Sequence, residues 1–304
     1  ANCTAALHVG LLSLGVGSGD VVVVTPYSWV ATANVIELCG ATPVFVDIDP
    51  DTFNLDGDKL AALLDARGDV KAVMPVHTFG NPAGIGRVCQ IAADHGVHVV
   101  EDAACALGSS EAGRMAGSLG TVGCFSFHPR KAITTGEGGM LTTADEHLAT
   151  LFEVLRSHGA EESDLARHAG ASGFALPEFK RLGFNYRMTD IQAAIGVVQM
   201  GRLEGILEAR RALAARYTDV LEGIEPPTRR GHGMLSMCGM RQCIEISSQM
   251  SAATMPPYSA TMNADTMLPH PMAMSAHVAA EAAHREGKFW EMYQRIFSSQ
   301  QDLA

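Results

Sequence analysis

A lysine in a turn rich in glycine and threonine is the first residue of this sequence that could do chemistry. Lys131 follows the apolar run at 122–128, and the sequence T-T-G-E-G-G comes shortly after it at 134–139. A lysine becomes a nucleophile only when its ammonium group loses a proton, which partial burial or a neighbouring cation promotes. The setting therefore suits an amine that bonds to a carbonyl group, although an ordinary surface lysine fits the same pattern.

Two other features could bind a ligand. Glu101 and Asp102 directly follow the apolar run at 97–100, and a carboxylate at the carboxyl end of a strand lies where open α/β proteins bind ligands. The residues Asn2, Cys3 and Thr4 open the first expected helix, whose free N–H groups and dipole attract a phosphate. Taken singly, Asp102 also fits a helix-capping acid, and the turn at 2–4 fits a routine N-cap.

Together these features resemble the DegT/DnrJ/EryC1/StrS family, the sugar aminotransferases of fold type I that use pyridoxal 5'-phosphate. The resemblance runs from residue 1 to about residue 224. Its first matching stretches are T-A-A-L-H at 4–8, G-D-V-V-V-V-T-P at 19–26, A-T-A-N at 31–34 and G-A-T-P-V-F-V-D at 40–47. The others are E-D-A-A at 101–104, F-S-F-H-P-R-K at 125–131, T-G-E-G-G at 135–139 and F-N-Y-R-M-T-D-I-Q-A-A at 184–194.

The resemblance assigns the catalytic roles to Lys131 and Asp102. It implies that Lys131 holds the cofactor covalently and, once released, moves protons as general base and acid. It implies that Asp102 pairs with the pyridine nitrogen of the cofactor and keeps that nitrogen protonated. The protonated ring can then withdraw electrons from the reacting carbon.

The same resemblance assigns four further residues to cofactor binding. Thr4 and Ser126 are expected on the phosphate, and Trp29 flat against the pyridine ring. Asn185 is expected to reach the phosphate of the neighbouring subunit, which implies a homodimer with shared active sites. Without the family, Trp29 also fits a core aromatic, Ser126 an outward-facing strand residue and Asn185 a turn former.

The implied reaction is the transfer of an amino group from glutamate to a keto-sugar nucleotide of the NDP-4-keto-6-deoxyhexose type. Such a step belongs to the biosynthesis of amino sugars for cell-surface polysaccharides or secondary metabolites. One alternative is a truncated or chimeric dimer that binds the cofactor without turnover. Another is a thioredoxin-like redox module formed by the tail of the chain.

Composition excludes several other classes. A formal net charge of −11 with only 22 Lys and Arg residues gives no broad basic surface for nucleic acid or an anionic membrane. The sequence contains no apolar run of membrane-spanning length. Seven cysteines without a C-x-x-C pair favour reduced thiols in the cytoplasm, and the scattered histidines lack the spacing of a metal site.

The elements that must position these residues follow from the periodicity of the first half. Short apolar runs lie at 21–25, 43–47, 71–77, 97–102 and 122–128, with helical spacing at 4–14, 29–39, 58–64 and 86–95. This alternation predicts an α/β fold with a mostly parallel central sheet flanked by helices. A long helix is expected over 189–221, opened by a capping box, although Gly196, Gly201 and Gly205 weaken a single unbroken rod.

The chain is expected to divide into three parts. Residues 1–224 form the cofactor-binding large domain, with an exposed loop at 159–182. Residues 225–268 are a divergent, methionine-rich linker in place of a complete small domain. Residues 269–304, with a helix at 275–297, resemble a helical piece of DsbA-type thioredoxin-like proteins. Because the sequence starts without Met or a leader, we expect it to be an interior piece of a longer chain.

Two cysteines depart from the family pattern. Cys3 stands where a small residue is common, and Cys105 stands where glutamine or histidine is common and contacts the ring oxygen of the cofactor. Thiols are weak hydrogen-bonding groups, so these positions are expected to alter cofactor affinity or tuning. A redox role for Cys105 is the alternative to a neutral substitution.

Overall fold

The structure, a computed structural model, describes residues 1–161 and 178–220. Its centre is a six-stranded sheet with the strand order β2-β1-β3-β4-β7-β8. The strands are β1 (Val21–Val24), β2 (Thr42–Phe45), β3 (Val70–Met74), β4 (His98–Asp102), β7 (Val122–Ser126) and β8 (Gly139–Thr142). All neighbours are parallel except β8, which runs antiparallel to β7.

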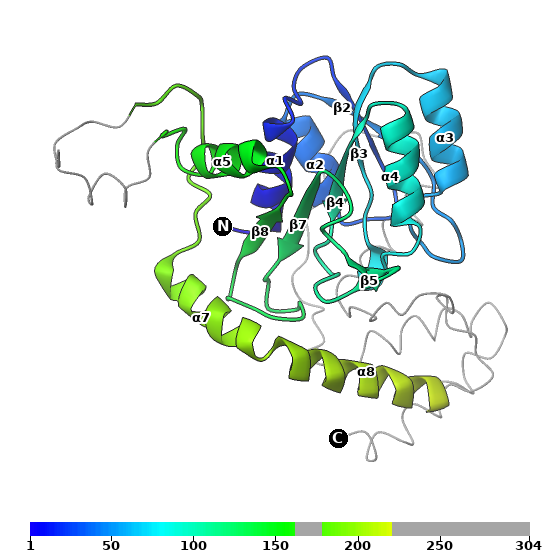
Figure 1. Cartoon of the computed structure of the whole chain (residues 1–304), viewed down its shortest axis with the longest axis vertical. Helices are drawn as coiled ribbons and strands as arrows, with labels where there is room; N and C mark the ends of the chain where they lie inside the picture. The colour runs from blue at the N-terminus through cyan, green and yellow to red at the C-terminus, as the bar shows by residue number, and fades with distance from the viewer. Residues whose placement is uncertain (162–177, 221–304) are drawn as a thin grey trace, which may run out of the picture.

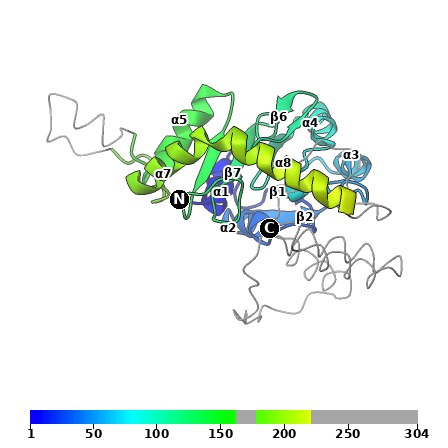
Figure 2. The ribbon, with the colours of Figure 1, turned by 90° about the horizontal axis from the view of Figure 1, so that it is seen from below.

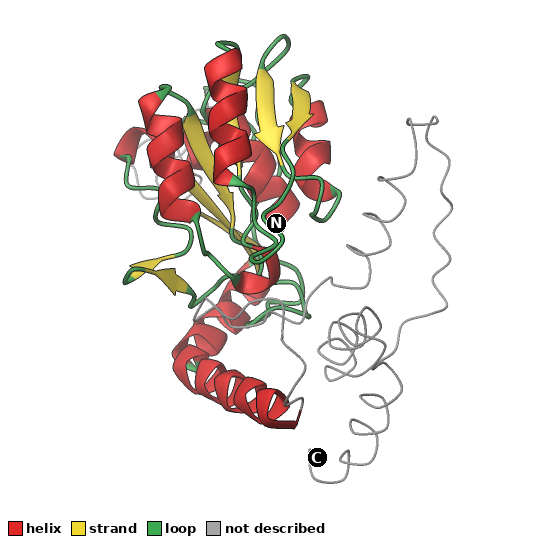
Figure 3. Ribbon diagram, turned by 90° about the vertical axis from the view of Figure 1, so that its right-hand side faces the viewer, coloured by secondary structure: helices red, strands yellow, loops and turns green. Residues whose placement is uncertain are grey.

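Helices cover both faces of this sheet (Figures 1 and 3). On one face, α1 (Cys3–Ser13), α2 (Ala31–Leu38) and α5 (Glu146–Leu155) contribute side chains to a single core cluster with Val22 and Val24. On the other face, α3 (Gly57–Ala66) and α4 (Ile85–Asp94) pack with Val21 and Val23. Because β1 is buried on both faces, it reads as a continuous valine run rather than an alternating pattern.

The five apolar runs and the four helices expected in the first half of the chain are confirmed. The sequence interpretation omitted β8, α5, the short helix η1 (Thr78–Gly80) and the two-stranded hairpin β5 (Ser110–Glu111) and β6 (Arg114–Met115). Strand β8 carries the sequence G-M-L-T, which has no strong strand signal. Its conformation depends on pairing with β7, an interaction between distant residues that local propensity does not record.

The long helix expected over 189–221 is two helices, α7 (Asp190–Gly201) and α8 (Leu203–Val220). The predicted capping box is present, because Thr189 and Gln192 exchange their side-chain and backbone hydrogen bonds. The break falls at Arg202, the C-cap of α7 directly after Gly201, whose φ of −103° and ψ of −1° depart from ideal α-helix values while staying in the right-handed helical region. Figure 2 shows the two helices end to end across the lower side of the molecule.

Part of the predicted organisation lies beyond what the structure describes. Of the exposed loop at 159–182, residues 159–161 and 178–182 are described, and Ala160 forms an antiparallel bridge with Phe179. The linker at 225–268, the fragment at 269–304 and its helix at 275–297 lie outside the described residues. Among helices of residues 1–161 and 178–220, none combines the length and hydropathy that crossing a bilayer requires.

Candidate active site

A cleft of about 370 Å³ opens where the carboxyl ends of the central strands meet the amino end of α1. Its wall includes residues that directly follow β1, β3, β4 and β7, together with the first residues of the chain. This edge is where open α/β sheets bind ligands, and the volume lies in the range of small-molecule sites. The cleft is therefore the candidate active site.

Five of the six residues that the sequence assigned to the cofactor line this cleft: Thr4, Trp29, Asp102, Ser126 and Lys131. The sixth, Asn185, is not among the lining residues; it is exposed and forms a backbone bridge with Ser157. The prediction places Asn185 on the cofactor of a neighbouring subunit, and this part stays a prediction.

Asp102, the last residue of β4, is held by two hydrogen bonds. Its side chain is buried, and Oδ2 accepts a hydrogen bond of 2.9 Å from the hydroxyl of Thr32 on α2. The backbone N–H of Ala104 donates to Oδ1 at 3.2 Å. Ser28 in turn lies 2.8 Å from the Thr32 hydroxyl. The carboxylate is thus fixed on the cleft wall by groups from two different elements.

The side chain of Glu101 lies on the opposite face of β4 from that of Asp102 and has a structural role. Its fully buried carboxylate accepts hydrogen bonds of 2.6–2.7 Å from Nε2 of His77 and from the backbone N–H groups of Gly117, Leu119 and Gly120. Burial by itself raises the pKa of Glu101, but the bonds from His77 and the backbone outweigh it and hold the pKa below the ordinary value of 4.5. Glu101 therefore anchors the turn at 117–120 rather than serving the cleft.

Lys131 lies on the turn that joins β7 to β8 and is partly buried. Its Nζ lies 3.1 Å from Sγ of Cys105. Its backbone N–H donates to the carbonyl of His128 at 2.9 Å, and its own carbonyl accepts a 2.9 Å hydrogen bond from Arg210 on α8. The amine is consequently positioned by its local turn and by a helix far along the chain.

The amino end of α1 packs against the first residue of β8, which directly follows the turn that carries Lys131. Asn2 caps this helix, because its Oδ1 accepts from the N–H of Ala5 at 2.8 Å. A side chain at position 139 would collide with the backbone of Asn2 and Cys3, so the close approach requires Gly139. The start of α1 is thereby brought to the cleft, where its dipole favours an anion near Thr4.

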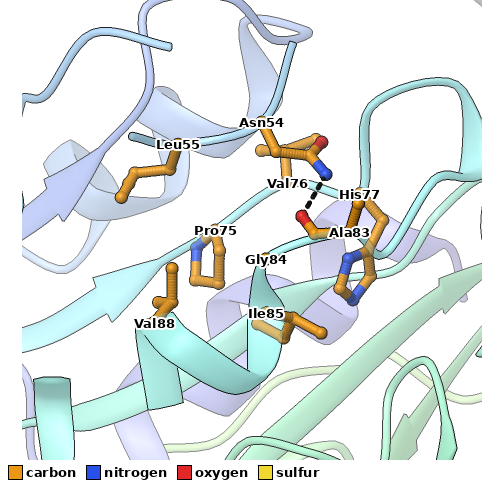
Figure 4. A pocket seen from close by; sticks show the side chains of 9 residues that line it. All are labelled: Asn54, Leu55, Pro75, Val76, His77, Ala83, Gly84, Ile85 and Val88. Atoms are coloured by element: carbon orange, nitrogen blue, oxygen red, sulfur yellow. Dashed lines mark hydrogen bonds between the residues drawn. The ribbon is translucent and has the colours of Figure 1, made fainter. Parts of the chain in front are cut away.

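A second, much smaller pocket lies beside the cleft and explains how its rim is built (Figure 4). Asn54 donates to the carbonyls of Asn81 and Ala83 at 2.8 and 2.9 Å, and accepts from the N–H of Thr78 at 3.0 Å. These bonds fix the segment that follows His77. A volume of about 10 Å³ is at the lower limit for one water molecule, so this pocket supports the rim and is not a ligand site.

Three residues with a clear structural task were missed by the sequence interpretation. Thr32 lies within the quoted stretch at 31–34, but nothing in the pattern pairs it with Asp102. His77 ends the apolar run at 71–77, and its place at the carboxyl end of a predicted parallel strand was a usable signal. Arg210 gave no signal, because its contact with Lys131 joins residues that are 79 positions apart.

The two departing cysteines both face the cleft, but their surroundings differ. Burial, followed by the nearby Asp102 carboxylate, raises the pKa of the Cys3 thiol well above its ordinary value of 9.0. Cys105 lies against the amine of Lys131. Within the described ranges, no group of three or more His, Cys, Asp or Glu residues could hold a metal ion.

The cleft provides what pyridoxal 5'-phosphate requires. It holds an amine for covalent attachment, a buried carboxylate to face the pyridine nitrogen, and an aromatic side chain, Trp29, that is 39% exposed and available to cover a ring. The hydroxyls of Ser126 and Thr4 and the end of α1 are suited to a phosphate. The residues present therefore fit this cofactor.

Comparison with known proteins gives consistent likenesses. The DegT/DnrJ/EryC1/StrS aminotransferase family matches residues 1–282. The chain is 43% identical over 235 residues to GDP-perosamine synthase of Caulobacter vibrioides, which covers 77% of this chain and 60% of that protein. It is 41% identical over 223 residues to the spore coat polysaccharide biosynthesis protein SpsC of Bacillus subtilis, covering 73% of this chain and 57% of that protein.

Solved structures agree. An aminotransferase from Psychrobacter cryohalolentis has a TM-score of 0.68 at 36% identity, covering 72% of this chain and 55% of that one. The PLP form of a putative sugar aminotransferase from Streptococcus pneumoniae has a TM-score of 0.69 at 31% identity, covering 77% and 62%. This likeness confirms the predicted fold class, fold type I with a mostly parallel sheet.

The family match extends further along the chain than the expected resemblance, whereas the chain covers only part of its relatives. The chain spans 57% to 60% of the length of the two curated relatives named above. The family match continues to residue 282, past the expected limit at about 224, and so includes part of the stretch assigned to the linker and the thioredoxin-like fragment.

Proposed function

The chain belongs to the DegT/DnrJ/EryC1/StrS aminotransferase family, and on that premise we propose that the whole protein transfers an amino group from glutamate to a keto-sugar nucleotide. The observation that carries this proposal is the presence of Asp102 and Lys131 in one cleft of suitable size. The names of GDP-perosamine synthase and of a structurally similar protein, DesI, crystallised in the presence of its TDP-sugar product, support the substrate class. We place the substrate among NDP-4-keto-6-deoxyhexoses.

In this proposal Asp102 would hold a proton at the pyridine nitrogen of the cofactor. When bound, pyridoxal phosphate supplies a protonated ring that stabilises negative charge on the reacting carbon. Thr32 and Ala104 keep the carboxylate of Asp102 in one orientation, so its charge stays directed into the cleft. Ser126 and Thr4 would hold the phosphate, and Trp29 would pack against the ring.

Lys131 attaches the cofactor and, once free, moves a proton at the substrate carbon as general base and acid. Arg210 and the carbonyl of His128 restrain the backbone of Lys131, so the amine returns to the same place after each transfer. His128, Arg130 and Glu137 line the same cleft as Lys131.

A homodimer completes the proposal. Helix α7 has no buried residue, and its exposed apolar side chains are Ile191, Ile195, Val197, Val198 and Met200. Such a row of apolar residues is typical of a surface that another protein covers. We assign it to a second copy of the chain, which would bring the exposed Asn185 to the partner's phosphate site. Free thiols at the five described cysteines fit a cytoplasmic location.

A cofactor-binding dimer without turnover is the second candidate, favoured by the chain's coverage of less than two thirds of its named relatives. We leave the thioredoxin-like resemblance of residues 269–304 outside the proposal, because the family match includes residues 269–282 and the sequence contains no C-x-x-C motif.

One set of measurements separates these candidates. The chain is mixed with pyridoxal phosphate, and the visible absorption band of the covalently held cofactor is recorded beside that of Lys131→Ala, with Lys180→Ala as an exposed-lysine control. The band should vanish only in Lys131→Ala. An equally strong band in that variant would overturn the proposed site. A band without amino transfer from glutamate to a keto-sugar nucleotide would favour the binding protein.

A further inference from the structure

The amine of Lys131 and the thiol of Cys105 form a close pair inside the cleft. Their Nζ and Sγ atoms are 3.1 Å apart, within hydrogen-bonding distance for sulfur. Cys105 follows β4 by three residues and is partly buried, and both residues line the cleft wall. A small oxidant that enters the cleft can therefore reach the sulfur, and the amine is already in contact with it.

The local charge distinguishes Cys105 from the other cleft thiol. An adjacent ammonium group stabilises a thiolate, which is the form of cysteine that oxidants attack. Cys3 lies in the same cleft, but burial and the Asp102 carboxylate raise its pKa and keep it protonated. Oxidation should consequently begin at Cys105.

We propose that Cys105 is an oxidant-sensitive modification site whose oxidised sulfur bonds to the nitrogen of Lys131. A hydroperoxide removes two electrons from the Cys105 sulfur, giving a sulfenic acid and releasing one molecule of water or alcohol. The proton that completes this water or alcohol comes from the Lys131 ammonium group, which becomes a neutral amine. This amine then attacks the sulfur. The S–N bond forms as the sulfenic hydroxyl leaves with one amine hydrogen as water, in the way that sulfenic acids condense with nitrogen.

The consequence is a reversible block of the amine. A nitrogen bonded to sulfur cannot also bond to an aldehyde, so the oxidised chain would not attach a cofactor until a thiol reduces the bond. The chemistry itself needs only Cys105, Lys131 and the oxidant. The inference thus goes beyond the proposed amino transfer and can be tested without it.

The test uses the full chain freed of cofactor and treated with one equivalent of hydrogen peroxide. The intact mass should fall by about 2 Da, since two hydrogens leave when the S–N bond forms. Proteolysis should then yield one cross-linked product that joins the peptides of Cys105 and Lys131. Dithiothreitol should restore the original mass.

Variants identify the partner. In Lys131→Ala the cross-link should be lost and Cys105 should instead be trapped by dimedone as a sulfenic acid, with the fold checked by circular dichroism. Cys105→Ser should abolish both products, while Cys3→Ser should behave as the unsubstituted chain. A 2 Da loss that persists in Lys131→Ala and maps to a Cys3–Cys105 disulfide would overturn the proposal. So would a peptide map of the unsubstituted chain in which Cys105 remains unmodified.

Discussion

The two chemical groups of the cleft are held in opposite ways. Asp102 ends a central strand and is 6% exposed. It takes its hydrogen bonds from the buried Thr32 on α2 and from the half-buried Ala104 in the loop after β4. Lys131 lies on a partly buried turn and depends on Arg210, from a helix far along the chain. The position of the carboxylate is therefore a property of the core, whereas the position of the amine depends on how α8 packs. Substitutions that disturb the carboxylate should therefore lower the stability of the whole fold, whereas substitutions that disturb the amine should act mainly on the backbone around Lys131.

The largest loss of stability should come from Glu101→Ala, which removes the carboxylate that joins β4 to the turn at 117–120. The substitution leaves the buried His77 and the backbone N–H groups of Gly117, Leu119 and Gly120 without their acceptor. We expect urea unfolding to show a loss of about 3–5 kcal/mol. Glu111→Ala is the control, because Glu111 also accepts two backbone bonds, from Gly84 and Gly86, but at an exposed site. Equal losses in both variants would contradict a special role for burial.

Thr32→Val should have the next largest effect, since it removes the hydroxyl that donates to the buried Asp102 carboxylate. A hydrogen bond to a charged group contributes about 1.5–3 kcal/mol, and we expect a loss of this size in unfolding free energy. Thr32→Ser keeps the hydroxyl and should lose less than Thr32→Val. If the serine and valine variants are equally stable, the Thr32 bond does not hold the carboxylate.

Arg210→Met probes the amine side of the comparison. It removes the bond to the Lys131 carbonyl, and the unfolding free energy should fall by only about 0.5–1.5 kcal/mol. Hydrogen exchange at the backbone around Lys131 should accelerate much more than exchange in β4. Arg211→Met is the neighbouring control, because Arg211 forms an exposed ion pair of 3.7 Å with Glu204. Equal exchange in the two variants would show that α8 does not position the amine.

Acid should produce the smallest and most gradual effect. Because the folded pKa of Glu101 lies below its ordinary value of 4.5, its contribution to stability is complete above about pH 4.5 and is lost as the pH falls through the folded pKa. In Glu101→Gln this group no longer titrates, so unfolding free energy should decline less steeply with acid below about pH 4.5. If the unfolding free energies of the unsubstituted chain and Glu101→Gln fall in parallel with pH, titration of Glu101 does not cause the loss of stability in acid.

Much of the fold could be predicted because the signals are local. The valine run at 21–24 and the other apolar runs located five strands, and Thr189 with Gln192 located the start of α7. Asp102 and Lys131 could be singled out because each lies next to a recognisable strand or turn. The partners of these residues could not, since the Thr32 bond spans 70 positions and the Arg210 bond spans 79. Such pairings depend on the packing of whole elements.

The contact at Gly139 has a consequence for how the cleft can change over time. The turn that carries Lys131 leads into Gly139, the first residue of β8. The backbone of Gly139 lies directly against Asn2 and Cys3. With no side chain between them to yield, a shift of the first helical turn must be transmitted to the lysine turn. An alanine at position 139 would push the first turn of α1 away from the segment that carries Lys131. During evolution of this sequence, residue 139 should therefore stay glycine, whereas the exposed neighbour Met140 should vary.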